Sequence, residues 1–278
     1  MSDVAPTPLP APSSDEVVRL PLSRRLASSS LFLGLVSLVG AALLWQLAVT
    51  IFPIKSYLLP SPVEIASTMF SQFPFQAQHA VVTLREVLVG FAIAALIGIP
   101  TAVAITFLPI VEKLFYPILV ATQAVPKVAV APLFLVWFGF GEAPKVAMAA
   151  VIAVFPVIID TAVGLRAIDP DMVRLARSMR AGPLKTFWKV RLPVALPNIF
   201  AGLKMAMTFS VIGAVVGEFV AGTSGLGYLI QAATGTLQTT IAFASVVLLS
   251  LMGIVLFLIV EAFERIFVSW HPSMDRLY

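Results

Sequence analysis

The sequence predicts an all-α membrane protein with about six transmembrane helices, and three observations support this fold class. Of the 278 residues, 59% are hydrophobic and only 12% are charged, whereas soluble domains carry about 25% charged residues. The mean hydropathy is +1.00. Apolar stretches long enough to cross a bilayer recur along the chain. A soluble fold is excluded because too little polar surface is available to cover so much apolar side chain.

The N-terminal segment, residues 1–30, predicts a disordered cytoplasmic tail. It contains five prolines and many serines and ends near Arg24 and Arg25, a composition that cannot bury a core. Residues 31–52 follow without a single charge and are long enough to cross a hydrocarbon layer of about 30 Å. A cleaved signal peptide is the alternative, but its apolar region would be shorter and no clear Ala-x-Ala cleavage site follows. A membrane anchor is therefore favoured.

Five further apolar stretches predict the remaining spans, and the six spans with their connecting loop form one transmembrane domain over residues 31–270. The five stretches are residues 87–108, 114–138, 146–165, 196–221 and 243–267. They leave a polar loop at 166–195 and a short tail at 271–278.

The charge distribution predicts the orientation of these spans. Eight basic and two acidic residues lie between Arg166 and Lys204, although the whole chain carries a net charge of only +4. Short basic loops stay on the cytoplasmic side of the membrane. Placing this loop inside puts both termini in the cytoplasm. The basic charge therefore indicates orientation, and no nucleic-acid partner is expected.

Two features of the spans predict how the helices pack. Three prolines, Pro117, Pro126 and Pro132, interrupt the third span, which indicates either a broken helix beside a watery cavity or a kinked packing helix. Small residues recur every four positions on two spans, which suits close contact within a subunit or between subunits. These small residues are Gly90, Ala94, Gly98 and Ala102 on the second span, and Gly213, Gly217 and Ala221 on the fifth.

The 166–195 loop predicts two short amphipathic helices. Asp169–Pro170–Asp171 is a helix start, because aspartate caps, proline suits the first position and a second acid suits the helix dipole. Gly182–Pro183 separates the two helices, and the second carries Leu184 and Phe187 on its apolar side. The pair could dock into a groove of another protein or lie on lipid headgroups, and the pattern alone leaves both open.

The segment VRLARSMRAGPLKTFWKVRLPVALPNIFAGL resembles the signature loop of the inner-membrane permease subunits of binding-protein-dependent ABC importers. That pattern is Glu-Ala-Ala, three residues, Gly, nine residues, Ile-x-Leu-Pro. Ala176 aligns with the second alanine of this pattern, and Val190, Leu192 and Pro193 align with its Ile-x-Leu-Pro end. Arg174 stands where the family has Glu, and Arg180 where it has the Gly that turns the chain between the helices. Gly182, two residues later, is then expected to make that turn.

The resemblance extends over about residues 57–260. LLPSPVEI, VPKVAVAPLFLVWFGFGEAPK, FPVIIDTAVGLRAID and GEFVAGTSGLGYLI resemble the branch that handles nitrate, taurine, alkanesulfonates and similar small solutes. It implies a type I importer fold in a bacterial inner membrane. It also implies two permease copies (a homodimer is expected), two cytoplasmic ABC ATPase subunits and an external solute-binding protein. The loop would couple the ATPases to the spans, with these coupling residues: Arg174, Ala176, Arg180, Gly182, Leu184, Phe187, Val190, Leu192 and Pro193.

No catalytic or cofactor-binding motif is recognisable in the chain. It lacks the Gly-x4-Gly-Lys-Ser/Thr phosphate loop, so ATP would be bound by another subunit. Without cysteine there is no thiolate nucleophile or Cys-ligated metal. The two histidines, His79 and His271, are far apart in sequence, which disfavours a metal site. We therefore expect a non-enzymatic permease without cofactors. A self-sufficient secondary transporter is the alternative, but it should carry several deep carboxylates.

Lys127 and Glu218 are the ionisable residues expected at depth in the membrane, in spans three and five. Buried charges there are costly and usually face a partner or a water path. They could neutralise each other, or Lys127 could extend to the interface. Alternatively, Lys127 and Glu218 line a translocation path, in which Lys127 supplies positive potential for a small anion such as a sulfonate or nitrate. Asp160, near the inner end of span four, is expected to be structural or to act in gating.

Overall fold

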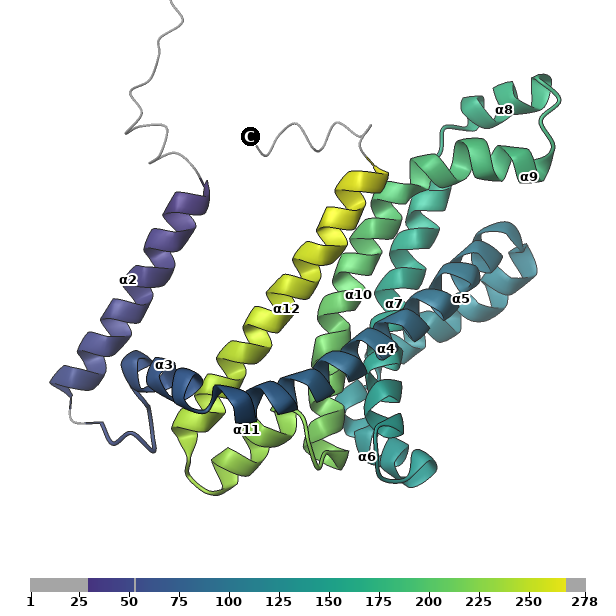
Figure 1. Cartoon of the computed structure of the whole chain (residues 1–278). Coiled ribbons are helices and arrows are strands. Elements are labelled where there is room, and N and C mark those ends of the chain that lie inside the picture. Colours follow the sequence, from purple (N-terminus) through teal and green to yellow (C-terminus); the bar gives the residue numbers. More distant parts are fainter. Residues whose placement is uncertain (1–29, 53, 269–278) are drawn as a thin grey trace, which may run out of the picture. The chain divides into compact units, whose positions relative to one another are not determined.

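The computed structural model describes residues 30–52 and 54–268, and every regular element in these ranges is helical (Figure 1). The chain divides into two units at Pro53. The predicted N-terminal and C-terminal tails fall, apart from Ser30, outside the described residues. In the first unit, α2 (Ser30–Ile51) is a 22-residue helix without a charged residue, about 33 Å long.

Four long helices form the frame of the second unit. These are α4 (Phe73–Phe107), α7 (Ala143–Arg166), α10 (Leu192–Ala221) and α12 (Thr239–Phe267). Each of the four is long and apolar enough to cross a membrane. A count of six spans therefore stays a prediction. Helix α7 packs against both α4 and α10, and α4 crosses the other two obliquely (Figure 1).

The small-residue stripes bring these helices together inside one subunit. A Cβ added to Gly213 of α10 would lie 2.6 Å from the Cα of Ala149 in α7. A Cβ added to Gly98 of α4 would lie 2.8 Å from the side chain of Val157, also in α7. Only glycine allows such close backbone approach. Both stripes therefore serve contacts within the chain.

The region predicted as span three is two helices rather than one. Helix α5 (Pro109–Ala124) ends before Val125 and Pro126, which are extended, and α6 (Lys127–Phe138) begins directly after them. Proline removes a helix donor and disfavours the helical region for the preceding residue. The break falls at Pro126, whereas Pro117 and Pro132 lie inside α5 and α6 without ending them. The sequence left a broken helix and a kinked helix open for this segment, and the structure has the broken helix.

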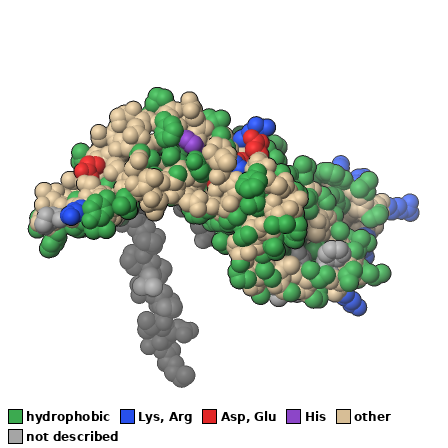
Figure 2. Space-filling model, turned by 90° about the horizontal axis from the view of Figure 1, so that it is seen from below, with side chains coloured by type: hydrophobic (Ala, Val, Ile, Leu, Met, Phe, Trp, Pro, Cys, Tyr) green, Lys and Arg blue, Asp and Glu red, His purple; other side chains and the backbone are tan. Residues whose placement is uncertain are grey.

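Short helices that hydropathy did not predict lie at the end of the bundle where α10 finishes and α12 begins. Helix α3 (Pro62–Ser71) starts with a capping box in which Ser61 and Glu64 satisfy each other's backbone N–H groups. Helix α11 (Leu226–Gly235) joins α10 to α12. Hydrophobic side chains are spread over this end of the molecule, and charged side chains gather in a few places (Figure 2).

The basic loop folds into a helical hairpin at the opposite end. Helix α8 (Pro170–Ser178) is followed by α9 (Pro183–Thr186), a π-turn η1 (Phe187–Arg191), and then α10 without interruption. The hairpin extends beyond the ends of α7 and α10 (Figure 1).

Candidate functional site

Helix α8 starts as its sequence predicts. The Asp169 side chain accepts a hydrogen bond from the backbone N–H of Asp171 at 2.8 Å, and Pro170 takes the first helical position. Arg174 forms an exposed ion pair with Asp171, one turn back along the helix. Such exposed pairs contribute at most about 1 kcal/mol, so Arg174 does little for the stability of the hairpin.

The turn after α8 is made by Arg180, so the expectation that Gly182 makes it is wrong. Arg180 has φ +57°, whereas Gly182 has φ −67° and ψ 164° and simply precedes α9. Two hydrogen bonds close a Schellman motif: Ala181 N to Ala176 O at 3.0 Å, and Arg180 N to Arg177 O at 2.9 Å. The hydrogen-bonding pattern therefore sets the turn position, and a non-glycine residue there costs about 1 kcal/mol or more.

Phe187 anchors the hairpin to the bundle. Its ring contacts that of Phe107 at the end of α4, with centroids 5.8 Å apart, and the Arg191 guanidinium lies 4.8 Å from the centre of the Phe107 ring. Three further predicted coupling residues, Val190, Leu192 and Pro193, are only partly exposed. This group holds the base of the hairpin and does not form its outer surface. The predicted coupling role of Phe187 stays a prediction, and in this structure its half-buried ring contacts α4.

The outer surface of the hairpin is formed by large apolar side chains. Leu175, Met179, Leu184 and Trp188 are each 60–75% exposed. Ala176, by contrast, is buried beneath α8. Leu175 and Met179 are four residues apart, so they share one face of α8. Exposed apolar side chains grouped on a projecting segment indicate an interaction surface.

Lys127 lies at the break between α5 and α6 and has no contact with Glu218. Its ammonium group lies 4.3 Å from the centre of the Phe155 ring of α7, a cation–π geometry. It lines a cavity of about 190 Å³ together with the aromatic side chains of Phe134 and Trp137. In the part of the chain that the structure describes, no carboxylate forms an ion pair with Lys127.

Glu218 caps α11 instead of pairing with Lys127, so mutual neutralisation of these two residues is excluded. Its fully buried carboxylate accepts hydrogen bonds from the Thr83 hydroxyl at 2.6 Å and from the backbone N–H of Gly227. The Thr83 oxygen in turn accepts from the backbone N–H of Leu226 at 2.8 Å. A negative charge at a helix N-terminus is favourable because of the free N–H groups and the helix dipole. Glu218 thus fixes α11 to α4 and α10.

A buried ion pair that the sequence analysis missed lies beside Glu218. The Lys145 ammonium of α7 pairs with the Glu86 carboxylate of α4, and both side chains are 3% exposed or less. Glu86 also lies close enough to Glu218 for their charges to interact. Hydropathy placed both residues just outside predicted spans. The available signal was their position at the outer ends of two spans that run in the same direction, Glu86 just before the second span and Lys145 just before the fourth.

Asp160 is partly buried and faces α10. A Cβ added to Gly202 of α10 would lie 2.9 Å from the Asp160 Cβ, so the absence of a side chain at Gly202 makes room for this carboxyl group. This contact fits the structural role expected for Asp160.

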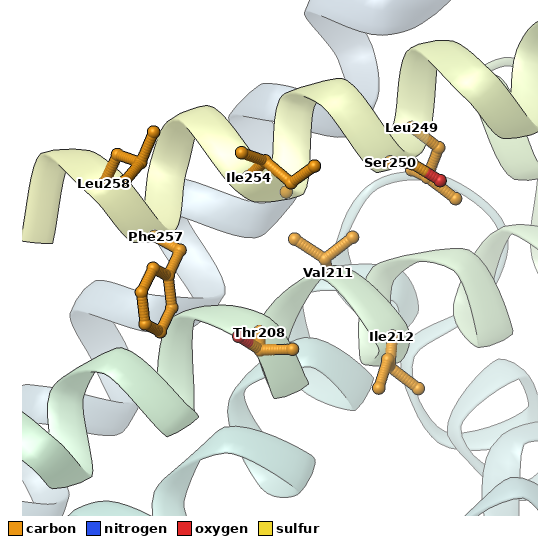
Figure 3. Close-up of a pocket in the computed structure, with 9 residues that line it drawn as sticks. Thr208, Val211, Ile212, Leu249, Ser250, Ile254, Phe257 and Leu258 are labelled. Carbon is orange, nitrogen blue, oxygen red and sulfur yellow. The ribbon is translucent and has the colours of Figure 1, made fainter. Parts of the chain in front are cut away.

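The groove between α10 and α12 offers little chemistry for recognising a polar solute (Figure 3). It encloses about 480 Å³ and is lined mainly by aliphatic and aromatic side chains. Its two hydroxyls are already used, because Thr208 donates to the carbonyl of Lys204 at 3.3 Å and Ser250 to that of Val246 at 2.9 Å. Among the described residues, His, Asp and Glu side chains nowhere gather in threes in a way that could hold a metal ion.

Known proteins resemble the chain along most of its length. A probable ABC transporter permease of Haemophilus influenzae is 36% identical over 225 residues, which is 81% of this chain and 92% of the relative. The riboflavin transport system permease of Chloroflexus aurantiacus is 36% identical over 244 residues, covering 87% and 91% of the two chains. The taurine transport system permease of Escherichia coli is 28% identical over 264 residues, covering 92% and 94%.

The fold has a counterpart among solved structures. A chain of the MetNI methionine ABC transporter, in an inward-facing conformation, aligns with a TM-score of 0.61 and 19% identity. The alignment covers 71% of this chain and 98% of that one, and at this identity it shows the fold alone.

The family assignment follows from the sequence match. Residues 94–270 match the model of the binding-protein-dependent transport system inner membrane component, and this range includes the hairpin, the Pro126 break and Glu218. The relatives support this reading over a self-sufficient secondary transporter. The chain therefore belongs to the inner-membrane permease subunits of binding-protein-dependent ABC importers.

Proposed function

We propose that two copies of this chain form the translocation path for a small solute across a bacterial inner membrane, with both termini in the cytoplasm. A separate ABC ATPase supplies the energy and docks on the hairpin of α8, α9 and η1. A solute-binding protein delivers the substrate from the outside. The ATPase and the binding protein are the partners that membership in this family implies.

One observation carries the docking proposal, namely the exposed apolar side chains of the hairpin. Leu184 is 71% exposed and Trp188 60% exposed. The hairpin that carries them projects beyond the long apolar helices (Figure 1), so lipid around those helices would not cover these side chains. Burying one such side chain contributes about 1.5–3 kcal/mol, and exposed aromatic anchors often dominate a protein interface. The contact of Phe187 with Phe107 holds the hairpin against α4, and η1 continues directly into α10. A displacement of the hairpin is therefore transmitted to these helices.

The test is a pull-down of the tagged chain from its own membranes in mild detergent, with the copurifying proteins identified by mass spectrometry. The unaltered chain should recover an ATPase that carries a nucleotide-binding phosphate loop. Leu184→Asp combined with Trp188→Asp should lose it. Leu237→Asp is the matched control, because Leu237 is 66% exposed on the loop after α11. Equal ATPase recovery by all three proteins would refute docking at the hairpin.

For the substrate we propose a small anion such as a sulfonate or nitrate. The support is Lys127, a partly buried cation at the helix break beside a cavity, where an ammonium group raises the local concentration of anions. Among the relatives, permeases for taurine and for aliphatic sulfonates are consistent with an anion.

Lys127→Met in the assembled importer tests this role. Uptake of taurine and of nitrate by reconstituted vesicles should fall at least tenfold for the true substrate, while Lys127→Arg retains most of it. Unchanged uptake by Lys127→Met, with intact ATPase capture, would remove Lys127 from the path.

A further inference from the structure

The hairpin exposes four cationic side chains that have no partner among the described residues. Arg177, Arg180, Lys185 and Lys189 are all exposed, and none takes part in the ion pairs found in this part of the chain. The other two cations of the hairpin are engaged, since Arg174 pairs with Asp171 and Arg191 covers Phe107. The free charge is thus concentrated around the α8–α9 turn.

Arg180 is the most informative of the four. It occupies a backbone position at φ +57° that glycine adopts without strain. Its side chain makes no hydrogen bond or ion pair with any described residue, so the fold of the chain offers no reason for an arginine there. A residue kept at a strained position without an internal contact is most simply explained by a contact made outside the chain.

The cations border the exposed apolar surface. Arg177 and Arg180 are three residues apart, and Met179 lies between them with 75% of its surface exposed. Just beyond the turn, Leu184 and Lys185 again place an exposed apolar side chain beside an exposed cation. A complementary partner would have an apolar floor with acidic side chains along its edge.

We propose that the hairpin selects an ATPase subunit whose docking groove has an acidic rim, and that Arg177 and Arg180 determine this choice. The inference rests on the proposed function, since it requires that an ATPase docks at the hairpin. Anionic lipid headgroups would also attract cations. Figure 1 argues against them, because α8 lies beyond α9 as seen from the ends of α7 and α10, which places it farther out than the ends of the long apolar helices.

The salt dependence of substitutions at Arg180 separates the effect of the charge from that of backbone strain, because only the charge is screened by salt. Arg180→Gly and Arg180→Asn both remove the charge and both tolerate the left-handed backbone, while Arg180→Lys keeps the charge. Leu237→Gly is the matched control, because Leu237 has φ +59° in the corresponding turn after α11. The probe is the ATPase recovered in the pull-down, titrated against each variant in detergent at low and at high salt.

At low salt, Arg180→Gly and Arg180→Asn should weaken ATPase binding roughly two- to fivefold, as expected for an exposed charge pair. Adding Arg177→Gln should weaken it further. Arg180→Lys and Leu237→Gly should bind as the unaltered chain does, and the differences should shrink at high salt because surface charges are screened. Equal binding by Arg180→Gly, Arg180→Asn and the unaltered chain at every salt concentration would overturn the inference.

Other outcomes distinguish this inference from the proposed function. If Leu184→Asp with Trp188→Asp abolishes binding while the Arg180 variants bind normally, docking stands and only the acidic rim is wrong. If no ATPase binds the unaltered chain, both proposals fall. If the Arg180 effect appears only in nanodiscs that contain phosphatidylglycerol and vanishes in neutral lipid, the arginine recognises headgroups and the acidic rim is refuted.

Discussion

The buried pair of Lys145 and Glu86 provides the sharpest stability prediction. Replacing Lys145 by Met removes the ammonium but leaves the Glu86 carboxylate in a site where both side chains are almost completely buried. The neighbouring Glu218 carboxylate adds repulsion. Leaving one buried charge without its partner costs about 3–5 kcal/mol. At about 2–4 °C per kcal/mol for a chain of this size, Lys145→Met should lower the Tm by roughly 6–20 °C.

The pair can be separated from its surroundings by a double-mutant cycle. Glu86→Gln should be milder than Lys145→Met, because it removes one of two neighbouring carboxylates. The double variant should be more stable than Lys145→Met alone, because no uncompensated Glu86 charge remains. The assay is the fraction of protein that stays monodisperse in size-exclusion chromatography after heating. A Tm for Lys145→Met within 2 °C of the unaltered chain, about 1 kcal/mol or less, would refute the assignment of a buried pair, as would purely additive effects.

Three further changes test other parts of the fold. Gly213→Ala should destabilise the chain by about 1–3 kcal/mol, seen as a lower Tm, because the new Cβ would meet the backbone of Ala149 at 2.6 Å. Leu237→Gly should stabilise by about 1 kcal/mol, seen as slower hydrogen exchange at the end of α11, because φ +59° is strained for leucine. The backbone N–H of Ser61 holds the pKa of Glu64 below its ordinary value of 4.5. The Tm advantage of the unaltered chain over Glu64→Gln should therefore be full above pH 4.5 and disappear as the pH falls through the lower folded pKa.

Each of these changes has an outcome that would contradict it. Gly253→Ala serves as the control for Gly213, because a Cβ there meets nothing within 4 Å, and equal Tm values for the two variants would refute the packing argument. Faster hydrogen exchange in Leu237→Gly would show that the contacts of the leucine side chain stabilise the chain by more than its strained backbone costs. A Tm difference for Glu64→Gln that grows as the pH falls would mean that the capping box prefers the protonated carboxyl.

Local features could be predicted from the sequence wherever the cause is local. The Asp169 cap and the proline at the first position of α8 follow from the chemistry of one or two residues. Three prolines in the predicted third span could not show which of them breaks the helix, and only Pro126 does. The turn at Arg180 is an instructive failure. Gly182 was the obvious residue for a left-handed backbone, but the hydrogen bonds that close α8 reach back from Arg180 and Ala181 and set the turn two residues earlier.

Faces and partners could not be predicted in the same way. Phe187 and Trp188 are adjacent and both aromatic, yet Phe187 contacts Phe107 and Trp188 is exposed. The interior of a membrane protein is about as apolar as lipid. Periodicity therefore shows which residues avoid water, but not which of them face protein.

By itself, the sequence determined the class of protein, the apolar segments and the start of α8, because hydropathy and caps act over a few residues. Membership in the permease family also follows from sequence likeness alone. Only the tertiary structure decided that Lys145 pairs with Glu86 and that Glu218 caps α11 rather than meeting Lys127. These partners come from helices far apart in the chain. A buried charge takes whichever counter-charge or helix end the packing brings near, and no local pattern records that choice.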